Sequence, residues 1–145
     1  MEPLDLNREI QTAKDAAKTA GKLLYENKKD LNKSIFSSDT DIKLKADIEA
    51  EYLIKSILTK ESSFPILAEE SRKPEGALAE TFWVVDPLDG TANYSRNIPL
   101  CCVSIALMHN MKPVIGFVYD FNNNNLYEGS FDREAKLNGN IIEVS

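Results

Sequence analysis

Two aspartates that follow an apolar stretch near the middle of the chain could bind metal ions. The run 82–85 is apolar and strand-like, and Asp86 and Asp89 come at its exit. Two carboxylates so close together are costly to bury unless a cation neutralises them. Their hard oxygen atoms favour Mg²⁺ or Mn²⁺. The spacing therefore suggests a divalent metal site, while the plainer interpretation is that the two acids are only turn or N-cap residues.

The next two residues are suited to holding a phosphate group. Gly90 lets the backbone approach a ligand closely, and Thr91 begins a polar stretch. If a helix starts at this turn, its free N–H groups point at an anion that the metal ions also hold. The segment 81–91 as a whole is therefore typical of a metal and phosphate site.

A second acidic pair follows another apolar run, which covers residues 64–68. Glu69 and Glu70 end this run, again at the exit of an expected strand. Two strands that each end in carboxylates can present them at one edge of a sheet. We therefore expect these acids to lie near Asp86 and Asp89.

The elements that must position these residues form one mixed α and β domain. Two helices are predicted before the acidic clusters, the second over 46–58, and a polar connection over 27–41 separates them. Strands are predicted up to Glu69 and Asp86 and then over 103–108, 113–119 and 126–131, with a short helix at Gly90 and a hairpin turn over 122–125. The first helix has apolar positions at spacings of three and four: Leu6, Ile10, Ala13, Ala17, Ala20 and Leu24.

Composition excludes several classes of protein. The chain has 145 residues, 23 acidic against 17 basic, and a net charge of −6, so a nucleic acid polymer would be repelled over most of the surface. No run approaches the ~18 apolar residues of a membrane span, and the first residues do not resemble a signal peptide, so we expect a cytoplasmic protein. The adjacent Cys101 and Cys102 fit packed, reduced thiols, and His109 fits a surface turn.

Five segments together resemble the inositol monophosphatase family of metal-dependent, lithium-sensitive phosphatases. The resemblance spans nearly the whole chain, and its central segment is specific because strand, acids, Gly-Thr and an Asn-aromatic pair occur in order. The segments are LKADIEAE (44–51), ILAEES (66–71), WVVDPLDGTANY (83–94), IPLCCVSIAL (98–107) and LNGNIIEVS (137–145). The resemblance implies an α+β fold, in which two long helices pack on a mainly antiparallel sheet.

The resemblance also implies a role for each residue of the site. The metal ligands would be Glu69, Asp86, Asp89 and the backbone carbonyl of Leu88. Asp89, Gly90 and Thr91 would bind the phosphate. The catalytic residues would be Glu69, Thr91 and Asp47, with Asp47 bonded to the Thr91 hydroxyl and Thr91 orienting the attacking water. From the residues alone, Asp47 would be a solvated position of the second helix. In the family pattern the first acid of the pair is the ligand, so the resemblance implies that Glu70 is solvated or outside the ligand set.

The family pattern implies hydrolysis of a phosphate monoester by a metal-activated water. Two or three Mg²⁺ ions would take part, with Mn²⁺ as a substitute and Li⁺ as an inhibitor. The substrate would be a small phosphorylated metabolite of the inositol monophosphate type, and a homodimer is possible. The alternatives are 3′,5′-bisphosphate nucleotidase or fructose-1,6-bisphosphatase activity, or a metal-binding fragment without activity.

One departure from the family pattern concerns the end of the chain. No Trp-Asp-x-Ala-Ala segment occurs, and in the family that segment supplies a further metal-binding Asp. Residues 1–145 are therefore expected to form a single N-terminal metal- and phosphate-binding domain without the C-terminal half of the family fold. Because one ligand is missing, we expect this chain alone to be weakly active or inactive.

The haloacid dehalogenase phosphatases offer a rival interpretation, since their strand also ends in Asp and continues to Asp-Gly-Thr. In that family one residue separates the two acids. Here Pro87 and Leu88 both intervene, which takes the second acid out of register for protonating a leaving group. The spacing therefore favours direct attack by water over a phosphoaspartate intermediate.

Overall fold

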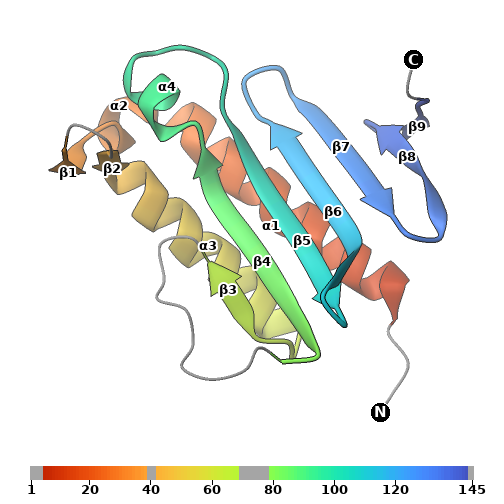
Figure 1. Ribbon diagram of the computed structural model, residues 1–145. Coiled ribbons are helices and arrows are strands. Elements are labelled where there is room, and N and C mark those ends of the chain that lie inside the picture. The colour runs from red at the N-terminus through yellow and green to blue at the C-terminus, as the bar shows by residue number, and fades with distance from the viewer. Residues whose placement is uncertain (1–4, 39–41, 69–78, 144–145) are drawn as a thin grey trace.

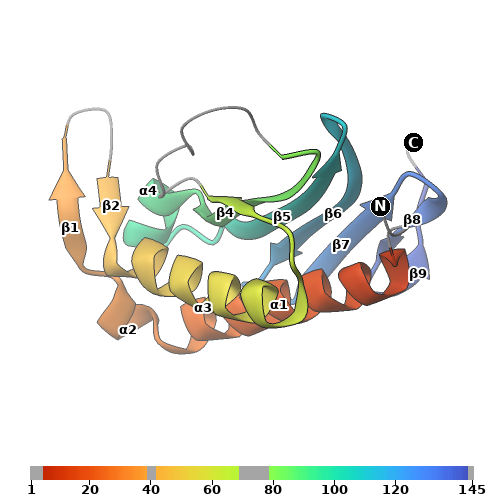
Figure 2. The same cartoon turned by 90° about the horizontal axis from the view of Figure 1, so that it is seen from below.

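Two long helices cover one face of a seven-stranded sheet in the computed structural model, which describes residues 5–38, 42–68 and 79–143 (Figures 1 and 2). The helices are α1 (Leu6–Glu26), α2 (Lys28–Leu31), α3 (Lys45–Glu61) and α4 (Thr91–Ser95). The strands are β1 (Ser34–Ser37), β2 (Ile42–Leu44), β3 (Ile66–Ala68), β4 (Thr81–Asp89), β5 (Cys102–His109), β6 (Lys112–Asp120), β7 (Asn125–Ser130), β8 (Arg133–Leu137) and β9 (Asn140–Ile141).

The large sheet runs in chain order from β3 to β9, and only its first pair is parallel. Alternate residues of β5 and β6 point toward the helices and are buried there, as period-two strands require. Helix α1 packs on β5 and β6, and α3 packs on β4 and on α1. The α+β fold with two long helices on a mainly antiparallel sheet is confirmed.

Helix α1 follows the predicted apolar stripe. It begins after Asp5, whose side chain caps the backbone N–H of Arg8 at 3.2 Å. Ala13, Ala17 and Ala20 are fully buried, so the helix approaches the sheet closely. Gly21 continues this close face, because a Cβ there would lie 2.3 Å from the Tyr119 ring.

Helix α3 also follows its predicted stripe, with one addition that matters for function. Ala46, Ala50 and Ile54 are buried in the core. Asp47 is buried with them and keeps only 1% of its surface exposed, so a solvated position for this residue is excluded.

The prediction of a plain polar connection over 27–41 is wrong in part. The segment contains the short helix α2 and the strand β1, which forms a two-stranded sheet with β2. Leu31, the one apolar residue that α2 buries, attaches this segment to the core. The polar side chains concealed this structure because all four residues of β1 are exposed and show no alternation. Residues 39–41 lie outside the described part.

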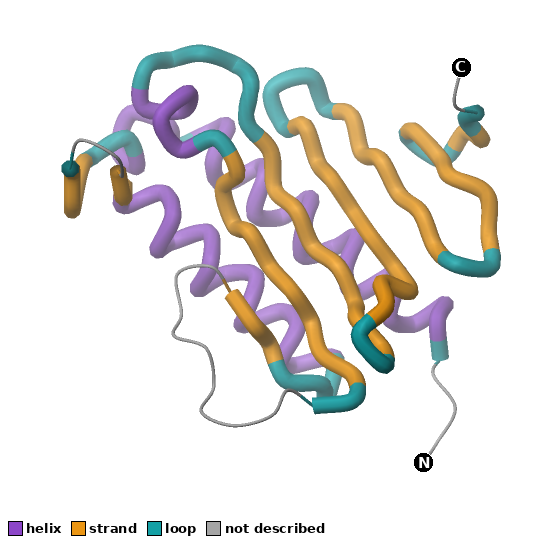
Figure 3. The backbone as a smooth tube through the Cα atoms, in the orientation of Figure 1, coloured by secondary structure: helices purple, strands orange, loops and turns teal. Residues whose placement is uncertain are grey.

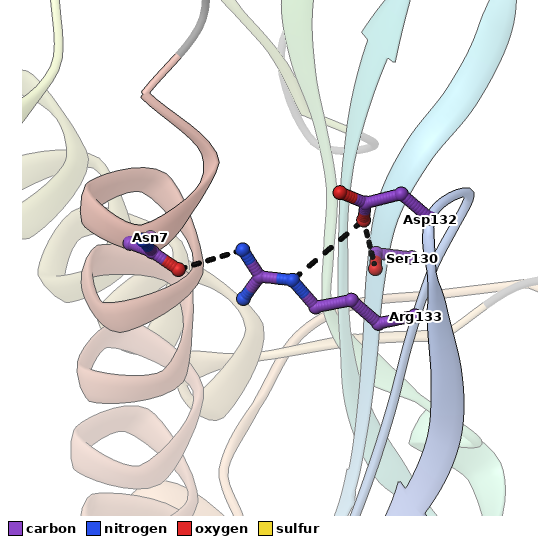
Figure 4. A network of polar contacts seen from close by, with 4 residues as sticks. All are labelled: Asn7, Ser130, Asp132 and Arg133. Atoms are coloured by element: carbon purple, nitrogen blue, oxygen red, sulfur yellow. Dashed lines mark hydrogen bonds and ion pairs between the residues drawn. The ribbon is translucent and has the colours of Figure 1, made fainter.

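Most predicted strands are present, including the hairpin turn between β6 and β7. Two short strands, β8 and β9, were not predicted, because their residues are largely exposed and lack an alternating pattern. An interaction far apart in sequence holds this end of the sheet against α1 (Figure 4). Arg133 Nη2 donates a hydrogen bond of 2.6 Å to Asn7 Oδ1, and its Nε lies 3.7 Å from Asp132 Oδ1, which also accepts from Ser130.

No helix among the described residues is long and apolar enough to cross a membrane. Cys101 is buried and Cys102 is half-buried, and both are free thiols. His109 ends β5, with its Nδ1 2.7 Å from Thr81 Oγ1.

Candidate metal and phosphate site

A bulge in β4 brings the two central aspartates to one face of the sheet. Asp86 lies opposite Ser104 and Asp89 lies opposite Cys102, so two residues of β4 stand against one residue of β5. In a regular strand, residues three apart point to opposite faces. The extra residue reverses this, and the two acids share the face that carries neither long helix.

Pro87 and Leu88 form the bulge itself. Proline has no N–H to contribute to a ladder, so it is tolerated at such a break. The Leu88 side chain is buried in the core, which fixes the bulge, and its N–H donates to Asp86 Oδ1 at 3.3 Å. The strand thus continues to Asp89 instead of ending at Asp86 as expected.

The negative charge of this face affects the pKa of the Cys102 thiol. Burial first, and then the nearby carboxylates of Asp89 and Asp86, raise the pKa of Cys102 to about 11. The thiol also donates to Asp89 Oδ2 at 3.9 Å. Two carboxylates therefore act together at one point, which is the charge arrangement that a divalent cation balances.

Thr91 and Asp47 are joined by a hydrogen bond from helix α4 to helix α3. The Thr91 hydroxyl donates to Asp47 Oδ1 at 2.8 Å and lies 3.2 Å from the carbonyl oxygen of Leu88. The other oxygen of Asp47 accepts the Leu44 N–H at 2.8 Å, so both carboxylate oxygens are engaged. Because the Thr91 proton is directed to Asp47, the lone pairs of Thr91 Oγ1 can accept a hydrogen bond from a water molecule.

Gly90 occupies a position that no other residue fits without strain. Its φ of +93° lies in the left-handed region, and a Cβ there would meet the Leu100 carbonyl oxygen at 2.8 Å. The glycine turns the chain from β4 directly into α4 (Figure 3). Because α4 has only five residues, any phosphate binding would depend on the backbone of the Gly90–Thr91 turn and not on the dipole of a long helix.

A depression of about 460 Å³ opens beside this turn. Asp89, Gly90 and Cys102 line it, together with Asn93 of the Asn-aromatic pair. Asp120 also lines it, although the sequence did not single this residue out. Asn93 fixes one wall by donating to the Leu100 carbonyl oxygen at 2.8 Å. No sequence pattern marked Asp120, because only the pairing of β5 with β6 brings it to this place.

The remaining predicted ligand falls outside the described part of the chain. Strand β3 ends at Ala68, which is paired in parallel with Val85, directly before Asp86. Glu69 and Glu70 come next in the sequence and lie outside the described residues. Among residues 5–38, 42–68 and 79–143, no group of three or more acids, histidines or cysteines could hold a metal ion.

The donor set nevertheless suits a hard divalent cation. Asp86 is half-buried and Asp89 is exposed, so both can present oxygen atoms at the same face. The Leu88 carbonyl lies between them in the chain and has an oxygen atom of the same hard type. The described residues thus offer oxygen atoms of the kind that a divalent cation prefers, but fewer than a complete ligand set.

The fold and this arrangement of acids beside a Thr–Asp pair are the features expected of a metal- and phosphate-binding domain. The profile of the inositol monophosphatase family matches residues 5–145, so the chain belongs to that family, whose members are metal-dependent phosphatases. An inositol monophosphatase from Dictyostelium discoideum is 35% identical and matches the whole chain and 55% of its own length.

Two further relatives match similar shares of this chain and of their own length. The fructose-1,6-bisphosphatase/inositol-1-monophosphatase of Aquifex aeolicus is 32% identical over 97% of this chain and 54% of its own length. The structure of inositol monophosphatase from Anabaena (Nostoc) sp. PCC 7120 is 32% identical, with a TM-score of 0.83 over 98% of this chain and 51% of its own. The chain spans about half the length of the relatives that it matches.

Proposed function

We propose that this chain is the metal- and phosphate-binding domain of a phosphatase that hydrolyses a small phosphate monoester of the inositol monophosphate type. The observation that carries the proposal is the convergence of Asp86 and Asp89 on one sheet face, next in the chain to a Thr91 hydroxyl already bonded to Asp47. Family membership supports the reaction class. A cytoplasmic location belongs to the same proposal.

Each site residue that the structure describes has a role that its contacts support. Asp86, Asp89 and the Leu88 carbonyl would hold Mg²⁺ or Mn²⁺, with Glu69 as a further ligand. Such a cation lowers the pKa of a bound water and stabilises charge on phosphoryl oxygen atoms. Gly90 and Thr91 would hold the phosphate through their backbone, together with Asp89.

Thr91 and Asp47 would act as a unit on the attacking water. Asp47 is buried and cannot turn toward solvent, because its second oxygen is bonded to the Leu44 N–H. It therefore keeps the Thr91 proton directed away from the depression. The Thr91 oxygen would then accept a hydrogen bond from the water and orient that water toward phosphorus.

Fructose-1,6-bisphosphate is the second candidate substrate, since the Aquifex relative carries that activity in its name. A 3′,5′-bisphosphate nucleotide and an inactive metal-binding role complete the set of alternatives. Asp86 and Asp89 lie on the sheet face that neither long helix covers. We therefore propose that residues from outside 1–145 pack on this face and complete the active site. We therefore expect residues 1–145 alone to have feeble activity.

Phosphate release under Mg²⁺ tests the proposal directly. The chain would be assayed with inositol 1-phosphate, fructose 1,6-bisphosphate and 3′-phosphoadenosine 5′-phosphate, and also in any longer natural protein that contains it. We expect Mg²⁺-dependent release from inositol 1-phosphate, weak in the short chain and abolished by Asp89→Asn. Trapping of a phosphoaspartate at Asp86 would contradict direct attack by water. Metal-independent hydrolysis would contradict the site itself.

A further inference from the structure

The phosphate-binding turn is carried by a helix that cannot hold its own position. Helix α4 has five residues and follows directly on Gly90. A single helical turn is unstable in water because the cost of nucleation exceeds the gain from so few hydrogen bonds. The position of Thr91 must therefore be fixed by contacts with other elements.

Tyr94 makes a contact of this kind with helix α1. Its ring is fully buried, and its hydroxyl donates to the carbonyl oxygen of Leu24 at 2.8 Å. Leu24 lies in the last turn of α1, where carbonyl groups lack helical partners. The same residue closes the turn through its backbone, since the Tyr94 N–H donates to the Gly90 carbonyl at 2.9 Å.

Helix α2 and the β6–β7 turn support the Tyr94 ring. The Lys28 ammonium lies 5.1 Å from the ring centroid, and the Phe121 ring meets it edge-on at 6.3 Å. Asn32 adds a contact to the end of α4 by donating to the Ser95 carbonyl at 3.1 Å. Helix α4 is thus held by α3 through Thr91, by α1 through Tyr94 and by the end of α2 through Asn32.

We infer that Tyr94 is a positioning residue for the phosphate-binding turn, and that its hydroxyl bond to Leu24 fixes the Gly90–Thr91 backbone in its binding conformation. The inference rests on the proposed function, because it assigns Tyr94 a part in phosphate binding. Tyr94 lies three residues after Thr91, nearly one helical turn further along the same face of α4. A shift of the Tyr94 backbone would therefore also shift the backbone of Thr91.

The test compares two substitutions that each remove one hydroxyl. Tyr94→Phe keeps the ring and its contacts with Lys28 and Phe121. Tyr119→Phe is the matched control, because the Tyr119 hydroxyl donates to Asn124 Oδ1 at 2.7 Å and, among the described residues, makes no hydrogen bond to the Gly90–Thr91 turn. Amide hydrogen exchange at position 94 and binding of inorganic phosphate with Mg²⁺, followed at the Gly90 and Thr91 amide signals, are measured in the full chain.

Tyr94→Phe should speed exchange at position 94 by about fivefold, which corresponds to one lost hydrogen bond, and weaken phosphate binding by a similar factor. Tyr119→Phe should change neither quantity, although both variants should unfold at slightly lower temperature. Equal exchange and equal phosphate affinity in Tyr94→Phe and the unsubstituted protein would overturn this inference alone. Absence of any Mg²⁺-dependent phosphate shift in the unsubstituted protein would overturn the proposed function and this inference together.

Discussion

Asp47 accepts a hydrogen bond of 2.8 Å from the hydroxyl of Thr91, a residue 44 positions later in the chain. The bond joins the first turn of α3 to the turn that follows β4. Asp47 is buried, and its second oxygen is also bonded, so this carboxylate serves the fold and the proposed chemistry together.

Replacing Asp47 by Asn should therefore destabilise the protein. One of its two oxygen acceptors becomes an NH₂ donor, which then faces either the Leu44 N–H or the Thr91 hydroxyl. A buried donor left without a partner costs about 1–3 kcal/mol, and urea unfolding should show a loss of this size. Glu49→Gln, on the exposed face of the same helix, is the control and should be nearly neutral. Equal stability of the two variants would show that the Asp47 contacts contribute little.

Thr91→Ala should preserve metal binding and lose rate. The substitution removes the oxygen that would accept a hydrogen bond from the attacking water and orient it, while Asp86 and Asp89 are unchanged. The rate of phosphate release should fall about 100-fold, the size of loss that misplacement of a reacting group causes. Thr91→Ser retains the hydroxyl and should recover most of the activity. Wild-type kinetics in the alanine variant would remove Thr91 from the mechanism.

The two left-handed glycines of the described residues, Gly90 and Gly139, permit a paired test of the Gly90 turn. Gly90→Ala places a methyl group 2.8 Å from the Leu100 carbonyl oxygen, whereas Gly139→Ala, at a φ of +83°, meets nothing within 4 Å. Gly139→Ala should cost about 1–2 kcal/mol of stability from backbone strain alone. Gly90→Ala should cost clearly more, by thermal or urea unfolding. Equal costs would mean that the close approach to Leu100 is relieved by a small shift.

Glu9 should make stability depend on pH. Its carboxyl group is buried, with Oε2 lacking a hydrogen-bond partner, and burial raises its pKa above the ordinary 4.5, against a lowering by Ser62. The folded state thus binds this proton more tightly than the unfolded state. The contribution is fully present below pH 4.5 and is lost as pH rises through the folded-state pKa.

Glu9→Gln should remove this pH dependence and raise stability near neutral pH, since it keeps the shape without the charge. Ser62 also accepts a hydrogen bond of 3.0 Å from the indole N–H of Trp83, the only tryptophan in the sequence. The fluorescence of Trp83 should therefore follow the titration of Glu9. Glu26→Gln, an exposed acid near the other end of α1, is the control. A Glu9→Gln protein with an unchanged pH profile would contradict this account.

The sequence predicted those parts of the structure that depend on local pattern. The Ala-rich stripe of α1 and the apolar strands were readable because burial imposes a period on the residues. The strands β1, β8 and β9 were not, because their exposed positions carry no such period. Strand β1 is recognised in the structure by its backbone pairing with β2, and the residue types of the segment do not predict that pairing.

The site was predictable only in part for a similar reason. Asp86, Asp89, Gly90 and Thr91 all lie within residues 86–91, and their types alone suggested metal and phosphate. The β4 bulge that turns both acids to one face was not visible, because it depends on the register with β5. The contact between Tyr94 and Leu24 joins residues 70 positions apart and left no signal in the sequence.

Titration of the chain with Mn²⁺, followed by the electron paramagnetic resonance signal of the free ion, tests the central claim most directly. Asp86→Asn and Asp89→Asn should each weaken binding by at least about tenfold, a loss that even the outer partners of a metal can cause. Asp15→Asn, on the exposed face of α1, should bind like the unsubstituted protein. Unchanged Mn²⁺ affinity in both site variants would contradict the account that these two carboxylates bind a divalent cation together.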